Sequence, residues 1–278
     1  MKHIEGEYKG VEDLKIFYQA WIPEKSKAVI QIVHGFAEHS GRYLNVVNQL
    51  TPLGYVIYAN DHRGHGKSDG KRNHVDNFDQ YIEDEKILYD FIKNKHPNLP
   101  IFMLGHSMGS MIALLFTKKY EPLLKGLILS GTGTGAGEGT SKTLKLIVKA
   151  LAKIAPKKYI NPGLKADKLS HDSDVVKAYE NDPLVNADKI TIRLGWELMK
   201  GFENYDSITS SLQLPLLVQC GAEDSLIKGS EEVLRNAFNM KDKTIIIYDG
   251  LYHEVYNEIK EEREKVLNDL SNWLDKHI

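Results

Sequence analysis

The stretch Gly105-His106-Ser107-Met108-Gly109 decides the fold of this chain, because it joins two segments of opposite character. The apolar run 99–104 comes directly before it and has the length and composition of a buried strand. Residues 110–116 follow it and have the character of a helix. A Gly-x-Ser-x-Gly pattern between a strand and a helix indicates a nucleophile elbow, in which the two glycines remove side chains that would collide in the tight turn. We therefore predict that Ser107 projects its hydroxyl above the sheet edge, where the helix N-terminus adds positive potential.

A serine hydroxyl is a weak nucleophile, so it needs a base that a carboxylate orients. When a serine sits on such an elbow, the chain order is serine, then aspartate or glutamate, then histidine. The last quarter of the chain holds His253 and His277. His277 ends a charged helical segment, 258–276, and we expect it to be solvated. His253 follows the short strand 244–248, and catalytic groups of open α/β sheets gather at such strand ends. We predict that His253 is the base.

The carboxylate should follow the preceding strand, which we place at 214–221. Glu223 and Asp224 compete for this role, because strand alternation lets only one of them face the histidine. Asp224 is favoured, since the shorter carboxylate is the usual partner in such triads. Asp249 is a weaker alternative, because it is better suited to capping the turn in which it lies.

An oxyanion hole completes the predicted site. Its donors are normally the main-chain N–H after the nucleophile and one N–H from the loop after an earlier strand. The first is the amide of Met108. The second is the amide of Phe36, which follows the apolar strand 28–33, and Gly35 lets this backbone approach the substrate closely. His34 comes at the wrong place in the chain order for a base, so we expect it to brace the loop.

Strand-like and helix-like segments, among them a predicted helix over 42–50, alternate along most of the 278 residues, which predicts a parallel sheet with helices on both faces. The alternation stops after residue 130 and resumes near residue 214. We expect residues 1–130 and 212–278 to form the α/β core. Residues 131–211, which begin with the glycine-rich stretch 131–139, should form a cap inserted over the site.

The formal net charge of −2 provides no excess of positive charge with which the chain could bind nucleic acid.

The start of the cap segment has the pattern of a basic amphipathic helix. Within residues 142–154, lysines alternate with apolar residues at helical spacing. Such a helix can lie on an anionic membrane surface, or it can pack its apolar face over the pocket with its lysines in solvent. Both interpretations stay open at this point.

Three further features of the sequence bear on where in the cell the protein is found. Residues 1–7 lack the apolar stretch of a signal peptide, and no apolar run is long enough to span a bilayer. The only cysteine, Cys220, lies in an apolar strand and suits a reducing compartment. We expect a cytoplasmic protein, peripheral at the membrane surface if the basic helix binds lipid.

The chain resembles the monoacylglycerol lipase and lysophospholipase group of α/β-hydrolases over nearly its whole length. The motifs that carry the resemblance are 34–43 (HGFAEHSGRY), 61–70 (DHRGHGKSDG), 105–109 (GHSMG), 181–185 (NDPLV), 221–224 (GAED) and 252–254 (YHE). This resemblance implies an α/β-hydrolase fold with a mostly parallel eight-stranded sheet. It also implies a serine hydrolase that cleaves carboxylic esters of single-chain lipids, most of all monoacylglycerols, with no cofactor and no metal.

The resemblance also concerns individual residues near the pocket. Glu38 and Arg42 occupy positions that help to organise the polar end of the pocket in this family, so they are expected, with Gly35, to bind substrate. The alternative is a surface ion pair at i, i+4 spacing. The loop 61–69 is expected to hold the sheet edge together rather than to bind a metal.

Several alternatives to a monoacylglycerol lipase remain at this point. They are a lysophospholipase, a short-chain carboxylesterase or an aminopeptidase on the same triad, and a binding protein without turnover. A binding protein need not keep Ser107, Asp224 and His253 together, so their joint presence favours an enzyme.

Overall fold

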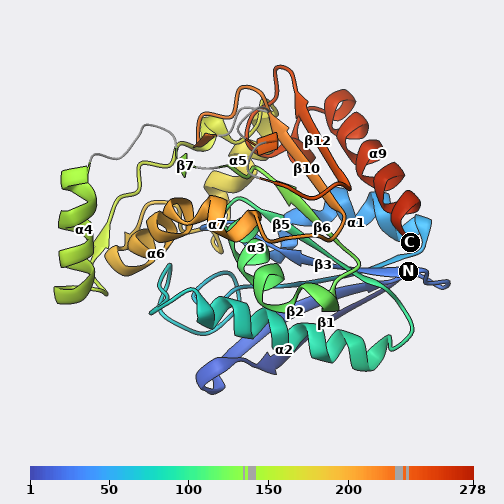
Figure 1. Cartoon of the computed structure of the whole chain (residues 1–278), viewed down its shortest axis with the longest axis horizontal. Helices are drawn as coiled ribbons and strands as arrows, with labels where there is room; N and C mark the ends of the chain where they lie inside the picture. The colour runs from blue at the N-terminus through green and yellow to red at the C-terminus, as the bar shows by residue number, and fades with distance from the viewer. Residues whose placement is uncertain (134, 137–141, 229–233, 236–237) are drawn as a thin grey trace.

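The computed structural model of the chain describes residues 1–133, 135–136, 142–228, 234–235 and 238–278. Its centre is an eight-stranded sheet in the order β1-β2-β4-β3-β5-β6-β10-β12 (Figure 1). β1 pairs antiparallel with β2, and β2 with β4, whereas all neighbours from β4 to β12 pair in parallel. The predicted mostly parallel eight-stranded sheet is thus confirmed. The strands are β1 (Lys2–Lys9), β2 (Lys15–Ile22), β3 (Ala28–Val33), β4 (Tyr55–Asn60), β5 (Ile101–His106), β6 (Gly126–Ser130), β10 (Leu216–Gly221) and β12 (Lys243–Tyr248).

Helices cover both faces of the sheet (Figure 1). Successive side chains of a strand point to opposite faces, so the apolar run of β3 serves two cores. Val29 and Val33 pack with α2 (Asp79–Lys95) and α3 (Met108–Tyr120). Ile30 and Ile32 pack on the other face with α1 (Leu44–Leu50) and α9 (Lys260–His277). A strand buried on both faces must be apolar throughout, which is why these strands are easy to recognise in the sequence.

The segment between β6 and β10 contains helices and very short strands. α4 packs on α6 and lies at the edge of the molecule, away from the sheet (Figure 1). Two-residue strands carry no periodicity, so the sequence could not have predicted them. The elements are β7 (Gly135–Ala136), α4 (Lys142–Ile154), β8 (Tyr159–Ile160), the 3-10 helix η5 (Ala166–Lys168), α5 (Ser173–Asn181), β9 (Ile190–Thr191), α6 (Ile192–Glu203) and α7 (Tyr205–Thr209). β7 pairs with β11 (Ile227–Lys228), and β8 pairs with β9.

The ends of several elements differ from the sequence prediction. The glycine-rich stretch 131–139 is described only at 131–133 and 135–136, so the rest of it lies outside the described residues. The predicted helix over 42–50 begins with a 3-10 turn, η2 (Ser40–Tyr43), before α1. The other 3-10 turns are η1 (Val11–Asp13), η3 (Thr51–Leu53), η4 (Glu121–Leu123) and η6 (Val255–Asn257).

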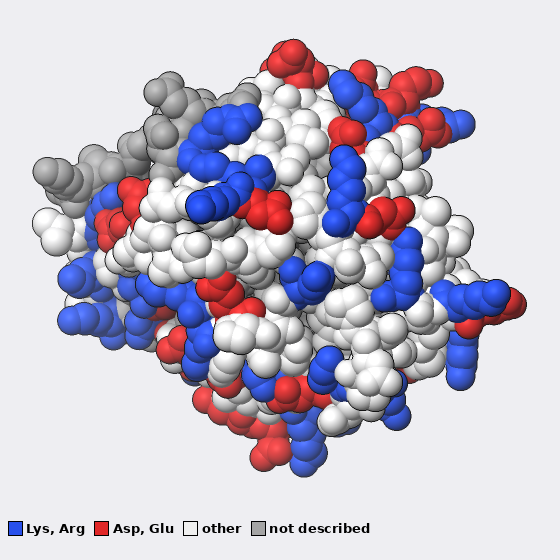
Figure 2. Space-filling view, turned by 45° about the vertical axis from the view of Figure 1, so that its right-hand side comes forward, with Lys and Arg blue, Asp and Glu red and all other residues white. Residues whose placement is uncertain are grey.

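Charge on the molecular surface is mixed. On the face shown in Figure 2, Lys and Arg side chains are interspersed with Asp and Glu rather than gathered into one basic patch. A search of the helices in the described residues finds none with the length and hydrophobicity needed to cross a bilayer.

Candidate active site

Ser107 occupies a strained turn between β5 and α3. Its φ of 54° and ψ of −121° place a non-glycine residue in a region that L-amino acids rarely adopt. A Cβ added at Gly105 would lie 2.5 Å from the Gly109 carbonyl oxygen and 2.8 Å from the Ala113 Cβ. One added at Gly109 would overlap the carbonyl oxygen of Val33. The elbow therefore depends on both glycines, and they allow strand and helix to meet closely enough to hold Ser107 in this conformation.

Asp224 and His253 form a buried hydrogen-bonded pair. The His253 Nδ1–H donates to Asp224 Oδ2 at 2.7 Å, and both side chains are about 95% buried, with 4% and 5% exposed. Two main-chain amides, those of Leu226 and Ile227, donate to Asp224 Oδ1 at 2.8 and 3.1 Å and fix the carboxylate. Asp224 follows β10 and His253 follows β12, and these neighbouring parallel strands bring the two loops to one edge of the sheet.

The two other candidates for the carboxylate that orients His253 lie at the surface. Glu223 and Asp249 are both exposed at the surface. The main chain turns so that Asp224, and not its neighbour Glu223, faces the imidazole. This is an outcome of the loop conformation after β10, which strand alternation alone does not determine.

The pair shifts the acidity of both partners. Burial alone would lower the pKa of His253, but the charge and the hydrogen bond of Asp224 outweigh burial and raise it. Burial would likewise raise the pKa of Asp224, but the interaction with His253 and the two amides lower it. The pair is therefore arranged to stabilise an imidazolium beside a carboxylate, which is what a general base in acyl transfer requires.

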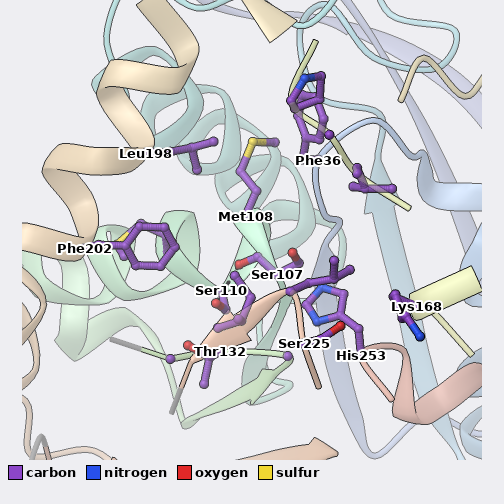
Figure 3. A pocket seen from close by; sticks show the side chains of 18 of the residues that line it. Phe36, Ser107, Met108, Ser110, Thr132, Lys168, Leu198, Phe202, Ser225 and His253 are labelled. Carbon is purple, nitrogen blue, oxygen red and sulfur yellow. Dashed lines mark hydrogen bonds between the residues drawn. The ribbon is translucent and has the colours of Figure 1, made fainter. Parts of the chain in front are cut away.

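Ser107 and His253 both line a cavity of about 740 Å³ (Figure 3). This volume lies in the range that encloses a small organic ligand. Most of the wall is apolar and comes from α3, from α6 and from the loop after β3. The apolar lining residues include Phe36, Met108, Met111, Ile190, Leu198, Phe202 and Leu226.

The two predicted oxyanion donors border the same cavity. Phe36 and Met108 line it together with Ser107, and both lie above Ser107 in the view of Figure 3. The loop that carries Phe36 comes very close to the elbow at Gly35, where an added Cβ would lie 3.2 Å from the Ser107 Cβ. Glycine at this position is thus a steric requirement of the close approach.

Glu38 and Arg42 do not line the cavity. Gly35 is also absent from the described residues that line it. Glu38 Oε1 instead accepts hydrogen bonds from the Gly35 amide at 2.6 Å and from the Tyr43 hydroxyl at 2.9 Å. The ion pair between Glu38 and Arg42 has the expected i, i+4 spacing, but it is buried, not at the surface.

Arg42 also binds the loop that carries His253. Its guanidinium donates two hydrogen bonds to Glu254, at 2.6 and 2.8 Å, and lies 4.6 Å from the ring centroid of Tyr179 on α5. Burial would raise the pKa of Glu254, but Arg42 lowers it to about 2. Burial raises the pKa of Glu38 despite the same cation. One arginine thus connects the loop of the predicted oxyanion hole, the loop of the predicted base and the segment between β6 and β10.

The histidines and charged residues near His34 hold the loops together. The His62 main-chain N–H donates to His34 Nε2 at 2.9 Å, and Asp61 Oδ1 accepts from the amide and hydroxyl of Ser40 at 2.8 and 2.6 Å. Among the residues that the structure describes, no group of His, Cys, Asp or Glu side chains is arranged to hold a metal.

Sequence reasoning missed Gly131 and Glu254. Gly131 directly follows β6 and has a φ of 54°, and a Cβ there would lie 2.8 Å from His253 Cε1 and 3.0 Å from His106 Cε1. A glycine directly after the strand that follows the elbow is the signal that could have found it. Glu254 stands beside His253 in the sequence, but its partner Arg42 is 212 residues away.

Replacing Gly131 with alanine should lower kcat by about 100-fold, because the added Cβ displaces the His253 ring from its position beside Asp224. Steady-state kinetics on a short ester would measure this loss. Gly195→Ala on α6 is the matched control, since a Cβ added there meets nothing within 4 Å. Unchanged kcat in the Gly131 variant would contradict the role assigned to this glycine.

The chain is similar to known proteins over its whole length. Residues 24–260 match the family described as serine aminopeptidase, S33. The monoacylglycerol lipase of Mycolicibacterium smegmatis is 36% identical over 99% of this chain and 98% of its own. The phospholipase YtpA of Bacillus subtilis is 33% identical over 93% of this chain and 99% of its own. Among solved structures, the Paleococcus ferrophilus monoacylglycerol lipase aligns with a TM-score of 0.81 and 27% identity, covering 100% of both chains.

Proposed function

Because the chain belongs to the serine aminopeptidase S33 family and has the α/β-hydrolase fold, we propose that it hydrolyses monoacylglycerols through an acyl-enzyme on Ser107. The chain is a carboxylic ester hydrolase that acts on lipids; the finer assignments are the head group and the residues. The observation that carries the residue assignments is the buried Asp224–His253 pair, whose imidazole lines a large apolar cavity together with Ser107. The head-group assignment rests on the similarity to monoacylglycerol lipases.

The mechanism follows from these positions. His253 takes the proton of the Ser107 hydroxyl as the oxygen attacks the ester carbonyl, and Asp224 stabilises the imidazolium that forms. The amides of Phe36 and Met108 hold the oxyanion, and each such donor is worth about 3 kcal/mol of transition-state stabilisation. His253 then returns the proton to the leaving alcohol. A water molecule, activated by His253, then attacks the acyl-enzyme in the same way, which releases the fatty acid and regenerates Ser107.

Hydrolysis of a monoacylglycerol series from short to long chains tests this proposal. A lysophospholipid and a short synthetic ester should be measured beside it, with Ser107→Ala as the control. We expect long monoacylglycerols to be preferred, because the apolar wall around Leu198 and Phe202 suits an acyl chain. Activity confined to the short ester would overturn the lipid assignment and leave a carboxylesterase.

An aminopeptidase needs an acidic group in the pocket to hold the substrate ammonium. Among the described residues that line the cavity, none is Asp or Glu, whereas Lys165 and Lys168 are present. This charge repels a free amino terminus and favours an ester substrate. Hydrolysis of aminoacyl amides at rates comparable with those of lipid esters would reverse this preference.

The pH dependence should report His253. The neutral imidazole is the base, so kcat/KM should rise as the pH increases through the pKa of His253 and then level off. Asp224 raises that pKa, so the rise should be centred above the ordinary value of 6.5. In Asp224→Asn the rise should move to lower pH. A profile that is flat from about pH 5 to 8 would argue against His253 as the base.

We further propose that residues 131–211 act as a cap and that α4 places this cap on a membrane. Residues of the segment, from Pro162 to Lys168 and on α6, line the cavity, whereas no described residue of α4 does. α4 instead exposes five large apolar side chains between 40% and 81%: Leu144, Leu146, Ile147, Leu151 and Ile154. Lys149 and Lys153 are exposed beside them, so the helix combines apolar side chains with positive charge, as interfacial helices do.

Binding to anionic vesicles should depend on this exposed apolar face. The double variant Leu146→Ser and Ile154→Ser should bind at least about tenfold more weakly, because each side chain loses roughly 1.5 kcal/mol or more of transfer free energy. Co-sedimentation with vesicles would measure it. Leu53→Ser is the matched control, since Leu53 is 41% exposed but lies on η3, outside the cap. Equal binding of all three proteins would contradict the membrane role.

A further inference from the structure

The wall of the cavity that α6 forms lies on the side of Ser107 away from His253. Leu198 and Phe202, both on α6, lie to the left of Ser107 in the view of Figure 3. His253 lies on the opposite side of Ser107 in the same view. In the proposed mechanism His253 protonates the leaving alcohol, so the alcohol must lie beside the imidazole. The acyl chain of a bound ester therefore extends toward α6.

Met111 belongs to the same part of the wall. It follows Ser107 by four residues on α3, and residues four apart lie on one face of a helix. Side chains of a helix point toward its N-terminus, so Met111 points toward the turn that begins at Ser107. Met111 lines the cavity, and on its other sides it packs in the apolar core. The cavity is therefore the space into which this side chain can move.

Gly201 on α6 lies directly against Met111. A Cβ added at Gly201 would lie 2.9 Å from both Cγ and Sδ of Met111 and 3.1 Å from its Cε, and these are its three nearest atoms. Non-bonded heavy atoms pack best at about 3.5–4.0 Å, so one of the two side chains would have to shift. Because methionine is unbranched and has three rotatable bonds, we expect Met111 to shift rather than the backbone of either helix.

The main chain does not require glycine at position 201. Gly201 lies inside α6 and is not among the glycines with a positive φ. Glycine inside a helix is less stabilising than alanine, so its presence here needs another reason. Gly195 on the same helix differs in this respect, since a Cβ added there meets nothing within 4 Å. The contact with Met111 is thus what distinguishes Gly201.

We infer that Gly201 and Met111 together determine the longest acyl chain that the site accepts. This inference rests on the proposed function, because it assigns the acyl side of that same site. With no side chain at position 201, Met111 lies back against α6 and leaves the cavity open to a long chain. A methyl group at position 201 would push Met111 into the cavity, where it would occupy the space that the distal carbons of a long chain need. A short chain that ends before Met111 would still fit.

The test is competition between hexanoylglycerol and palmitoylglycerol in one nonionic detergent micelle, which gives the ratio of the two kcat/KM values. This ratio does not depend on how much of a variant is folded. In Gly201→Ala we expect the ratio of palmitoyl to hexanoyl ester to fall at least about tenfold, the effect of one misplaced methylene in an apolar pocket. Adding Met111→Ala to this variant should restore the ratio, since no long side chain is then left to be displaced. Gly195→Ala is the matched control and should keep the ratio of the unmodified enzyme.

Each outcome supports or overturns the inference. An unchanged ratio in Gly201→Ala, or an equal fall in Gly195→Ala, would overturn it while the proposed function stands. A fall that Met111→Ala does not reverse would also overturn it, because the cause would then be a displacement of α6. If the unmodified enzyme cleaves p-nitrophenyl esters through Ser107 but neither glycerol ester, the proposed function fails. The same ratio, measured on p-nitrophenyl hexanoate and palmitate, then decides the inference by itself. Cleavage of hexanoyl esters alone would overturn both.

Discussion

The Ser107→Ala variant is expected to lose about 10⁶-fold in kcat, because removing the nucleophile of such a triad leaves only binding and the oxyanion hole to act. Alanine keeps the Cβ of serine, so the backbone at φ 54° should be retained with the same strain. Initial rates on a short ester would measure the loss, and thermal unfolding would show whether the fold persists. A fluorophosphonate probe should label the unmodified enzyme and leave the variant unlabelled.

Asp224→Asn should show a smaller loss than Ser107→Ala, about 10⁴-fold, because the imidazole remains but its tautomer and charge are no longer stabilised. Glu223→Gln is the matched control in the same loop, since this side chain is exposed and does not face His253. A Ser107→Ala variant with more than a few per cent of activity, or a Glu223 variant as impaired as the Asp224 variant, would contradict the proposed triad.

Replacing Arg42 with methionine should lower the free energy of unfolding by about 3–5 kcal/mol, because it leaves two carboxylates buried without their cation. Both Glu38 and Glu254 have side chains that are 5% exposed, and Arg42 itself is 10% exposed. Water cannot replace the guanidinium at such a site. Urea unfolding followed by circular dichroism would measure the change. The loss should be smaller at low pH, as protonation of Glu38 and Glu254 removes the uncompensated charge.

The control for Arg42 is an exposed pair of the same spacing. Lys9 and Asp13 are also an i, i+4 pair, but their side chains are 78% and 83% exposed. Lys9→Met should change stability by no more than about 0.5 kcal/mol, since solvent screens the pair. If Arg42→Met were as mild as Lys9→Met, the buried network would not be the element that holds the two loops together.

Much of the fold was predictable because its signals are local. The strand β3 was predicted with its observed bounds, since burial on both faces demands an uninterrupted apolar run. The helix α9 (Lys260–His277) also lies close to the predicted helical segment 258–276. The start of α1 was less accurate, because a 3-10 turn and an α-helix have similar composition over a few residues.

The interpretation of the basic helix in the proposed cap was the least determined by sequence. Its helical character follows from the spacing of apolar residues, and α4 indeed spans Lys142–Ile154. Which neighbour covers its apolar side cannot be read from that spacing. The structure packs α4 on α6 and leaves Ile147 and Leu151 exposed, and no described residue of α4 lines the cavity, whereas the spacing alone left both interpretations of this helix open.

The sequence by itself determined the elbow at Ser107, the strands that flank it and the chain order in which a carboxylate and a histidine must follow. These features depend on steric fit within a few residues and on hydrophobic periodicity, and both can be recognised from residues that are close together in the sequence. Only the tertiary structure decided that Asp224 meets His253 and that Gly131 gives room to the imidazole. It also decided that Arg42 joins Glu38 to Glu254, which is 212 residues further along the chain. Such pairings depend on how loops turn and how strands order themselves in space, and no local pattern encodes that choice.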